Sequence, residues 1–472
     1  MISRNFDLSS FFKATITISL PIALQNLLGT TAGMVDTIMI GSDGQVAVAA
    51  VGICSQISAL FSGFNWGFSS GAVLFFSQYW GAKNYKGINK TFGISLLFLM
   101  IVAFSFASVA TIAPEFLLRI YTDKENIIAV GAPYLRIVGF AYPLQIISLV
   151  LSTLMRSTER VKAPLVCSVL ALIVNFCLNF VLIYGRFGFP KLGVTGAAIG
   201  TLASSTVNVV ALCFSLLISK CDFRIKLLEM FDFRGGFIKN YLAKCLPIIW
   251  NEVLYGVGQM LINIVVGRQS EAAIAAMAAF RVLEGFVFAF FGGLSDASSV
   301  IVGKDVGAGH HMRGYRNAVA SSILCPAVTF CICLVLFLVN QPTLRLFGLE
   351  SEALFYGKYM LLIYLVAGSI RTCNYITNNC FRVGGESLFG AIMDLVCLFC
   401  LSVPATWIAG MIFDLPFLAV FAFVYMDEPV KLFFMTRYAR SGKWIKPVTE
   451  AGRATLPAFQ AELKQLRIRT QS

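Results

Sequence analysis

The sequence predicts an all-α integral membrane protein with twelve transmembrane helices in two six-helix bundles, related by a pseudo-twofold axis along the membrane normal. Three observations predict this fold class. Hydrophobic residues make up 58% and charged residues 13% of the 472 positions, against roughly 45–50% and about 25% in soluble domains. Apolar runs recur along the chain, each long enough for a bilayer crossing, which needs about 20 residues. The second half of the chain also repeats the first at a constant offset.

Polar residues or Gly and Pro separate the apolar runs. The first run follows Arg4 and Lys13, as a signal peptide would, but it lacks a small-residue cleavage site, so we interpret it as a retained helix. Several runs exceed a minimal crossing, which indicates tilt or extension beyond the bilayer. The twelve expected crossings are 14–40, 45–76, 91–113, 130–154, 163–185, 194–218, 239–266, 271–302, 317–339, 356–380, 387–410 and 415–438.

The basic residues predict the orientation of these crossings. Of the 37 Lys and Arg residues, 27 lie at the N-terminus, in or beside the even-numbered loops and in the C-terminal tail, and 7 belong to the odd-numbered loops. Because cytoplasmic loops carry the basic excess, we expect both termini in the cytoplasm and the protein in the cell membrane. The net charge of +13 then reflects topology, and we expect no nucleic-acid partner.

Four regions are expected along the chain. They are an N-lobe at 1–218, a cytoplasmic linker at 219–238, a C-lobe at 239–438 and a cytoplasmic basic tail at 439–472. The linker mixes basic and apolar residues, which favours a partly amphipathic helix on the inner membrane surface. We interpret the tail as a solvated or surface-lying helix.

The cysteines and the missing nucleotide motif limit the chemistry. Thirteen cysteines lie mostly inside apolar runs, which indicates no disulfide framework, and the Cys397-x-x-Cys400 spacing falls in such a run. We therefore expect no metal beyond a sodium ion, and no cofactor. The chain has no G-x-x-x-x-G-K-[ST] loop, so ATP is not expected as a direct energy source.

An internal repeat relates the two halves. A shift of 226 positions superposes the LPI sequence at 20–22 on that at 246–248. Each half has an even number of crossings, so both halves enter from the same side and the repeat is parallel. Two such bundles can rock about a central site and give alternating access. The same shift takes Gly41 to Gly267, Gly67 to Gly293, Gly81 to Gly307, Ala82 to Ala308 and Arg156 to Arg382.

An ordered set of short segments resembles the multidrug and toxic compound extrusion (MATE) family. The resemblance covers essentially the whole membrane part. It implies a secondary active antiporter that exports cationic or amphipathic drugs or toxins in exchange for inward protons or sodium. It further implies a monomer in contact with membrane lipids, and no enzyme. The segments are MVDTIMIG at 34–41, AVAAVG at 47–52, QYWGA at 78–82, GVTGAAIGT at 193–201, VGKDVGAG at 302–309 and RVGGES at 382–387.

Asp36 is the main candidate for cation or proton binding, because an ionisable group at a helix centre costs about 2.5–3.5 kcal/mol on insertion scales. The family resemblance adds Asn175, Asn179 and Thr201 to its site. Many relatives carry an acid at the Asn179 position, so this site holds less negative charge and is expected to bind sodium less well. The alternative is that Asp36 only locks the bundle by hydrogen bonding the asparagines.

Three further residues of the first crossing are expected to line the cavity or take part in gating. They are Pro21, Gln25 and Asn26. Pro21 removes a backbone hydrogen bond and can kink its helix. A kink coupled to protonation of Asp36 is a hypothesis that the family resemblance supplies.

In the second half, Glu252 resembles a cation-binding glutamate of the sodium-driven branch of the family. The acid that this branch carries in the tenth helix is replaced here by Arg371. An ion pair of Glu252 with Arg371 or Arg281 is therefore an equal alternative, since buried charges are usually paired. Further candidates for the substrate cavity or for gating are Arg281, Glu284, Asp296, Arg371, Asp394 and Asp427. Glu428 is expected to pair with Lys431.

Two other functions remain as alternatives. A lipid-linked oligosaccharide flippase of the related superfamily would also be polytopic, but it typically has a strongly cationic cavity and often fourteen crossings. An intramembrane enzyme is less favoured, because the sequence has no paired Asp-rich metal motif, no HExxH and no serine with a plausible intramembrane histidine.

Overall fold

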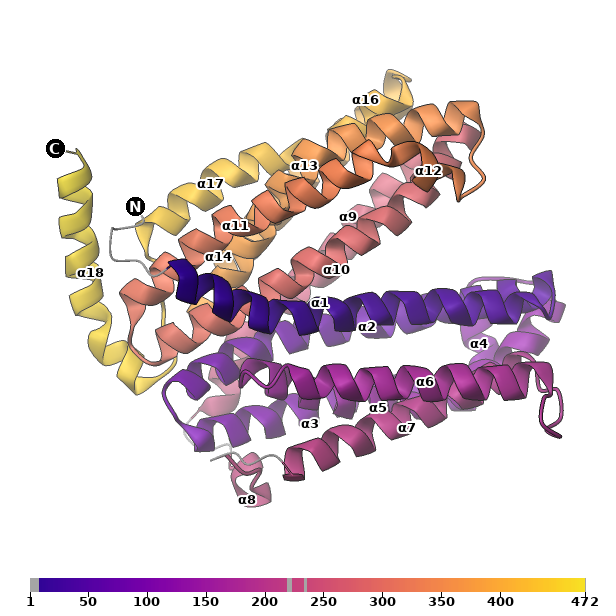
Figure 1. Cartoon of the computed structure of the whole chain (residues 1–472), viewed down its shortest axis with the longest axis horizontal. Coiled ribbons are helices and arrows are strands. Elements are labelled where there is room, and N and C mark those ends of the chain that lie inside the picture. Colours follow the sequence, from indigo (N-terminus) through magenta and orange to yellow (C-terminus); the bar gives the residue numbers. More distant parts are fainter. Residues whose placement is uncertain (1–7, 219–222, 233–235, 472) are drawn as a thin grey trace. The chain divides into compact units, whose positions relative to one another are not determined.

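The computed structural model describes residues 8–218, 223–232 and 236–471, and these residues form helices joined by short connections (Figure 1). Eleven of the described helices are long and apolar enough to cross a membrane. They are α1 (Leu8–Gly41), α2 (Gln45–Gly81), α3 (Tyr85–Ile112), α5 (Glu125–Ser157), α6 (Lys162–Tyr184), α7 (Val194–Ile218), α9 (Phe237–Val266), α10 (Glu271–Gly307), α11 (His311–Leu338), α13 (Ser351–Gly384) and the segment Leu388–Ile412.

The twelfth expected crossing, 415–438, is divided into α16 (Phe417–Phe423) and α17 (Asp427–Ser441). This crossing is therefore not one continuous helix, and Pro429 provides the physical reason. It is the third residue of α17, and it has no backbone N–H to bond the carbonyl four residues earlier. The helix therefore stops and starts again just before this proline.

Shorter helices lie in the connections. They are α4 (Pro114–Arg119), α8 (Leu227–Met230) and α12 (Asn340–Arg345), and the tail forms α18 (Glu450–Gln471). The expected linker, 219–238, lies partly outside the described residues. Its described part contains α8, which packs against α3.

The described residues divide into two compact units. The first unit comprises 24–72 and the described part of 85–238; the second comprises 8–23, 73–84 and 239–471. The boundaries at 23/24 and 72/73 fall inside continuous helices, so α1 and α2 each contribute to both units. The expected lobes instead assigned the whole of 1–218 to one body. Pro21 lies in α1, three residues before the start of the first unit, where its missing hydrogen bond makes a helix easier to bend.

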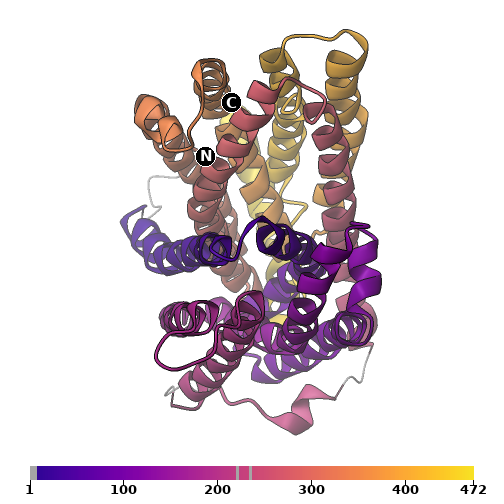
Figure 2. The same cartoon turned by 90° about the vertical axis from the view of Figure 1, so that its right-hand side faces the viewer.

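In the first unit, α6 packs against α7 and α5 packs against α3 and α7 (Figures 1 and 2). Glycines on α7 allow the close approach to α6. A Cβ atom added to Gly196 would lie 2.8 Å from backbone and side-chain atoms of Leu182. Small residues of this kind let membrane helices pack backbone to backbone.

In the second unit, aromatic rings fill the core between α10, α13 and α16. The ring of Phe280 lies 5.1 Å from those of Tyr364 and Phe421, both edge to face, a favourable arrangement for aromatic pairs. A second core cluster includes Trp444 from the tail.

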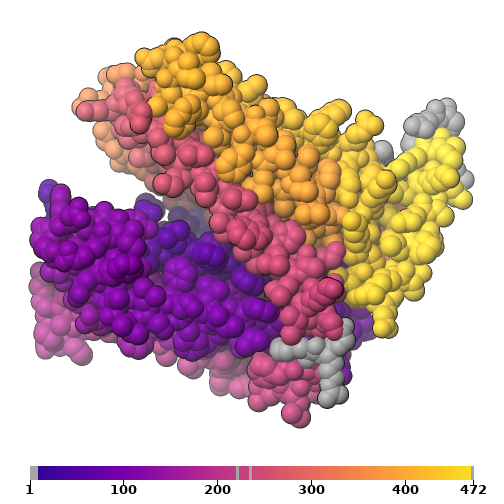
Figure 3. Space-filling model, turned by 180° about the vertical axis from the view of Figure 1, so that it is seen from behind, coloured from indigo at the N-terminus to yellow at the C-terminus, as the bar shows by residue number. Residues whose placement is uncertain are grey.

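The tail is attached to the second unit more firmly than expected. It does form the expected helix, α18, which is yellow on the surface in Figure 3. The segment before it is buried, however: Trp444 is 1% exposed. The backbone N–H of Lys446 donates to Gly384 O at 2.7 Å, and that of Val448 donates to Gln78 Oε1 at 2.8 Å. Apolar burial and backbone hydrogen bonds together stabilise this attachment.

Candidate functional site

The first unit brings Asp36 together with the two asparagines of α6. Asn179 donates from Nδ2 to Asp36 Oδ1 at 2.7 Å, and the same nitrogen lies 3.3 Å from Asn175 Oδ1. Asn175 and Asn179 are four residues apart, so they lie on one face of α6. Both asparagines are buried and Asp36 is half-buried. The structure thus joins an acid of α1 to a polar pair of α6 inside an apolar bundle.

Asn179 also presents an acceptor that has no partner in the described part of the chain. Its Oδ1 atom is buried, and an unpaired buried amide oxygen is costly unless something else satisfies it. Gly200 of α7 faces this oxygen: an added Cβ would lie 2.2 Å from it. A larger residue at this position would force the Asn179 amide to shift from its place beside Asp36.

The other candidates of the first half make separate contacts. Thr201 donates from Oγ1 to Ala197 O of its own helix at 3.0 Å, so this hydrogen bond does not reach Asp36. Gln25 donates from Nε2 to Ser168 Oγ at 2.8 Å, which joins α1 to α6. The backbone carbonyl of Asn26 accepts from Thr30 Oγ1.

Glu252 pairs with a different arginine from either of those expected. Its Oε1 atom lies 3.1 Å from Arg382 Nη1, and Arg382 Nη2 donates to Asn251 Oδ1 at 2.8 Å. The expected partners Arg371 and Arg281 are therefore wrong. The reason is that α13 continues to Gly384, so Arg382, which the sequence places in a loop, lies in the last helical turn and is 4% exposed.

Arg371 instead pairs with Glu284 across α13 and α10. Its Nη2 atom also lies 3.5 Å from the hydroxyl oxygen of Tyr255 on α9. Arg281, one turn before Glu284, donates to Asn263 Oδ1. Arg371 therefore already has a carboxylate partner.

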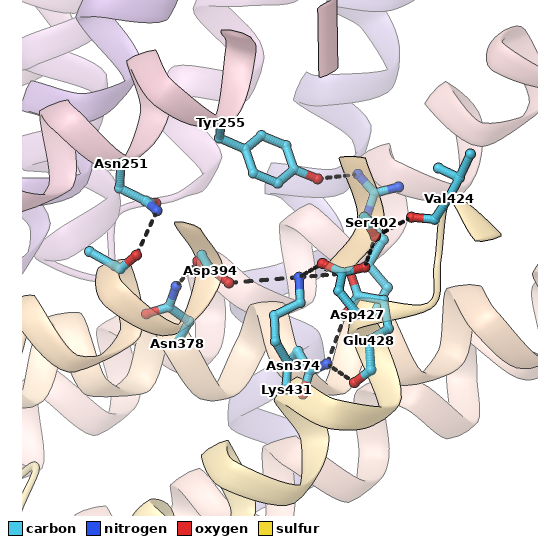
Figure 4. A network of polar contacts seen from close by, with 12 residues as sticks. Asn251, Tyr255, Asn374, Asn378, Asp394, Ser402, Val424, Asp427, Glu428 and Lys431 are labelled. Atoms are coloured by element: carbon cyan, nitrogen blue, oxygen red, sulfur yellow. Dashed lines mark hydrogen bonds and ion pairs between the residues drawn. The ribbon is translucent and has the colours of Figure 1, made fainter. Parts of the chain in front are cut away.

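Lys431 of α17 is the centre of a buried network (Figure 4). Its Nζ atom lies 2.9 Å from Asp427 Oδ2, 3.1 Å from Glu428 Oε1 and 3.9 Å from Asp394 Oδ1. The expected pair of Glu428 and Lys431 is confirmed, and Asp394 and Asp427 join it. Lys431 is 3% exposed, so its ammonium group depends on these carboxylates in place of water.

Neutral side chains fix the carboxylates of this network (Figure 4). Asn378 Nδ2 donates to Asp394 Oδ2 at 2.6 Å, and Asn374 Nδ2 donates to Glu428 Oε2 at 2.7 Å. Ser402 lies 2.7 Å from Asp427 Oδ1 and 2.8 Å from the carbonyl oxygen of Val424. It therefore contacts both the acid and the backbone at the break between α16 and α17.

Irregular helix surrounds the network. The segment 388–412 alternates α14 (Leu388–Cys397) and α15 (Val403–Trp407) with two π-helical turns, η1 (Leu398–Ser402) and η2 (Ile408–Ile412). Ser402 ends the first π-helical turn, and Asp427 begins α17 after the break. Acids in the first turn of a helix are favoured by its dipole, and π-helical turns frequently occur at functional sites.

The charges of this network and its neighbours do not balance. They comprise five carboxylates and four cations, an excess of one negative charge if all are ionised. Such an excess in a low-dielectric site favours a bound proton or a bound cation. The carboxylates are those of Glu252, Glu284, Asp394, Asp427 and Glu428, and the cations are Arg281, Arg371, Arg382 and Lys431.

A cavity of about 160 Å³ opens beside these charges within the second unit. Arg281, Glu284, Arg371 and Asp427 all line it, together with Tyr255. Asp296 does not line this cavity in the described part of the chain, although it lies on the same helix as Glu284. A small polar cavity with both charge signs can hold water or a small cation next to the carboxylates.

Several polar members of the second site were not predicted from the sequence. Polar residues within otherwise apolar runs were the available signal, because buried polar groups need partners. The pattern of Asn374 and Asn378, four residues apart, parallels that of the two asparagines beside Asp36. The missed residues are Asn251, Tyr255, Asn374, Asn378, Arg382 and Ser402.

Comparison with known proteins identifies the fold. The pattern of the MatE family matches residues 21–181 and 247–408, more than half of the chain. The two matched stretches begin 226 residues apart, which is the offset of the internal repeat. The chain is similar to an uncharacterized transporter, YisQ of Bacillus subtilis strain 168, at 20% identity over 93% of this chain and 95% of that one.

Two further relatives agree with this match. A probable multidrug resistance protein, NorM of Thermotoga maritima, is 24% identical over 92% of this chain and 93% of its own. A crystal structure of a variant of the Vibrio cholerae MATE transporter VcmN covers 92% of this chain and 97% of its own. It has a TM-score of 0.81 at 16% identity, which supports the same fold.

A polytopic helical bundle protein with buried charges of this kind belongs to the class of membrane transporters. The chain is a member of the MATE family. The all-α fold with twelve transmembrane helices in two bundles is confirmed, with α16 and α17 together forming the twelfth. Members of this family are transporters and not enzymes, so the enzyme alternative is excluded.

Proposed function

We propose that this protein is a secondary active antiporter that exports cationic or amphipathic drugs or toxins in exchange for inward protons or sodium. The main observation in support is that Asp36, a carboxylate inside a membrane helix, accepts a hydrogen bond from the buried amide of Asn179. The names of the relatives, which include a probable multidrug resistance protein, support the substrate class. An acid within a transmembrane helix is by default a functional group.

The amide of Asn179 suits a carboxyl group that changes its charge. Ionised Asp36 only accepts hydrogen bonds, and it accepts one from Asn179 Nδ2 at 2.7 Å. A protonated Asp36 is itself a hydrogen-bond donor. The partnerless Oδ1 atom of Asn179 would accept this hydrogen bond after rotation of the amide. A sodium ion would bridge the same two oxygens, since it takes oxygen ligands. Loading of Asp36 is thus coupled to rotation of the Asn179 amide at the contact between α1 and α6.

Inward movement of the coupled ion supplies the free energy for export. One inward charge crossing 100 mV releases about 2.3 kcal/mol, and a tenfold gradient of a neutral compound corresponds to about 1.4 kcal/mol. One ion per neutral drug could therefore hold a gradient of about fiftyfold from the electrical component alone. A monovalent cationic drug cancels this component at one-for-one exchange.

In the proposed transport cycle, loading of Asp36 with an ion alternates with loading of drug. In the outward-open state Asp36 takes up a proton or sodium ion and drug is released; the protein then turns inward-open, releases the ion and reloads drug. We place the protein in the cytoplasmic membrane as a monomer, with both termini in the cytoplasm. Pro21 on α1 is the proposed bending point, because its helix belongs to both units.

The charged network of the second unit is a second candidate place for the coupling ion. With its neighbours it has one more carboxylate than cations, which favours proton or cation uptake. Within it Asp394 is the carboxylate farthest from Lys431 Nζ, at 3.9 Å, so Asp394 is the acid least compensated by that lysine. Transport that survives Asp36→Asn but is lost in Asp394→Asn would move the assignment to the second unit.

Counterflow in proteoliposomes tests the proposed function. Purified protein is reconstituted with ethidium or norfloxacin inside, and proton and sodium gradients are imposed independently. Drug movement against its gradient driven by one of the two ions supports antiport and names the ion. No drug movement under either gradient, together with flipping of a lipid-linked oligosaccharide, would favour the flippase alternative instead.

A further inference from the structure

The cavity of the second unit has charges of opposite sign in its buried and its exposed parts. Its lining comes from α9, α10, α13, η1 and α17 and from the connection between α16 and α17. Its volume is about 160 Å³, whereas drug-sized pockets usually have about 300–1,000 Å³. The cavity can therefore take the charged end of an amphipathic compound but not a whole drug.

The acidic part of the cavity is buried. Asp427 and Glu428 line it and are 3% and 4% exposed, and both contact Lys431 Nζ (Figure 4). Asp394 Oδ1 lies 3.9 Å from the same nitrogen, so three carboxylates surround one ammonium group. This part of the cavity has two negative charges in excess if all four groups are ionised, and it attracts a positive group.

Arg281 supplies the positive charge of the exposed part. It lines the same cavity, and its residue is exposed. Its Nη2 atom donates to Asn263 Oδ1, a neutral acceptor. The ion pairs of the described residues do not include Arg281, because Glu284, one turn further along α10, pairs with Arg371. Arg281 therefore faces the cavity without a carboxylate partner among the residues that the structure describes.

The position of Arg281 in α10 makes this lack of a carboxylate informative. Arg281 lies ten residues after Glu271, the first residue of α10, which places it about 15 Å along the helix. A charged side chain within a membrane helix is costly unless water, a partner or a ligand solvates it, and such residues often mark a substrate pathway. Arg281 is thus a candidate for binding a negative group that enters the cavity.

We propose that this cavity binds the amine and the carboxylate of zwitterionic compounds, and that Arg281 selects the carboxylate. The inference rests on the proposed export function and names one class of its substrates. A guanidinium group has five N–H donors and can bind a carboxylate through two parallel hydrogen bonds. The amine enters towards Asp427 and Glu428. The rings of Phe280 and Tyr425 also line the cavity, and aromatic rings attract ammonium groups.

Compounds with a single charge match the cavity less well. An anion would add to the negative charge that the network already has in excess. A cation without a carboxylate would be repelled by Arg281 and would leave the guanidinium group without a counter-charge. A zwitterion adds no net charge, so the network can still take up a proton or a cation while the compound is bound.

Equilibrium binding to the whole purified protein in detergent tests this proposal. Norfloxacin has an amine and a carboxylate, and its methyl ester keeps the amine but lacks the negative charge. We expect the parent to bind norfloxacin with a Kd roughly tenfold or more below that of the ester, since charge-assisted hydrogen bonds are strong. Arg281→Gln should remove this preference by raising the Kd of norfloxacin without raising that of the ester. Arg281→Lys, which keeps the charge, should recover part of the preference.

A matched control and a measurement without any variant accompany this experiment. Arg268→Gln removes one charge from the exposed connection after α9 and should keep the full preference, because Arg268 is not among the described residues that line the cavity. The comparison of norfloxacin with its ester on the parent decides the matter even if Arg281→Gln does not fold.

Three results would overturn the inference. The first is equal Kd values of the two compounds, or no binding of norfloxacin, in the parent. The second is a preference that survives in Arg281→Gln. The third is an equal rise of both Kd values in Arg281→Gln, which would indicate that Arg281 acts only through its contact with Asn263. Ion-driven ethidium export without the carboxylate preference contradicts this inference alone, whereas the preference without ion-driven export contradicts only the proposed antiport.

Discussion

Replacement of Lys431 by methionine removes the ammonium group from the network and keeps a side chain of similar length. In the structure, Lys431 Nζ lies 2.9 Å and 3.1 Å from two carboxylate oxygens. At an effective dielectric constant of about 20, each contact corresponds to roughly 5 kcal/mol of attraction. Desolvation and repulsion between the carboxylates offset much of this. Breaking a buried pair by removing one partner costs about 3–5 kcal/mol, and we expect a loss of this size for Lys431→Met.

The assay is denaturant unfolding of the purified protein in mild detergent, which gives the change in the free energy of unfolding. Lys464→Met is the matched control, because Lys464 is exposed on α18 and its removal should change this free energy by no more than about 0.5 kcal/mol. The second variant Lys431→Met/Asp427→Asn should recover part of the loss, since one unpaired carboxylate is gone. A Lys431→Met variant as stable as the Lys464→Met control would refute the reasoning.

Three further predictions follow from other contacts. Gly200→Ala places a Cβ atom 2.2 Å from Asn179 Oδ1, so we expect a loss of about 1–3 kcal/mol and slower export in vesicles. Gly256→Ala, which meets nothing within 4 Å, should change neither. Arg382→Gln leaves a carboxylate of α9 unpaired and should lower the unfolding free energy by about 3–5 kcal/mol; unchanged unfolding would contradict this. Burial opposes ionisation of Glu386, but the hydrogen bond and charge of Lys446 and the backbone N–H groups of Phe389 and Leu388 together outweigh it and lower the pKa below its ordinary value of 4.5. The resulting stabilisation is present above pH 4.5 and is lost as pH falls through the lowered pKa. Protease cleavage of the tail should therefore increase in acid in the parent, and Glu386→Gln should remove this pH dependence.

The helices and the repeat could be predicted because they depend on local composition and on a fixed offset. Asp36, Asn175 and Asn179 share a site in the structure because the two asparagines lie one turn apart and the acid lies in a neighbouring helix. The break before Pro429 was also readable, since proline lacks the N–H of a continuous helix. It was not predicted, because hydropathy stays high along the whole of 415–438.

Ion-pair partners could not be predicted from spacing. Glu284 and Arg371 are 87 positions apart, and Glu252 and Arg382 are 130 apart, so each pairing depends on how helices pack. Arg382 was misplaced because the end of α13 lies in a stretch of low hydropathy around Gly384. Buried polar groups reveal that a partner is needed, but only the tertiary structure decides which one.

The burial of the tail segment before α18 could not be predicted from composition for the same reason. Its basic residues predicted solvation, yet Trp444 and Ile445 are buried in the core of the second unit. A single tryptophan within a charged segment was the available signal, because large aromatic side chains contribute strongly when buried.

The most direct test of the central claim compares the parent with Asp36→Asn in proteoliposomes that contain a pH-sensitive dye and, in parallel, a sodium-sensitive dye. The account predicts that ethidium export by the parent is accompanied by counter-movement of one of these ions. It further predicts that Asp36→Asn abolishes both movements while the protein stays folded, with an unchanged gel-filtration profile. Undiminished ethidium export with undiminished ion movement in Asp36→Asn would contradict the assignment of Asp36 as the coupling carboxylate.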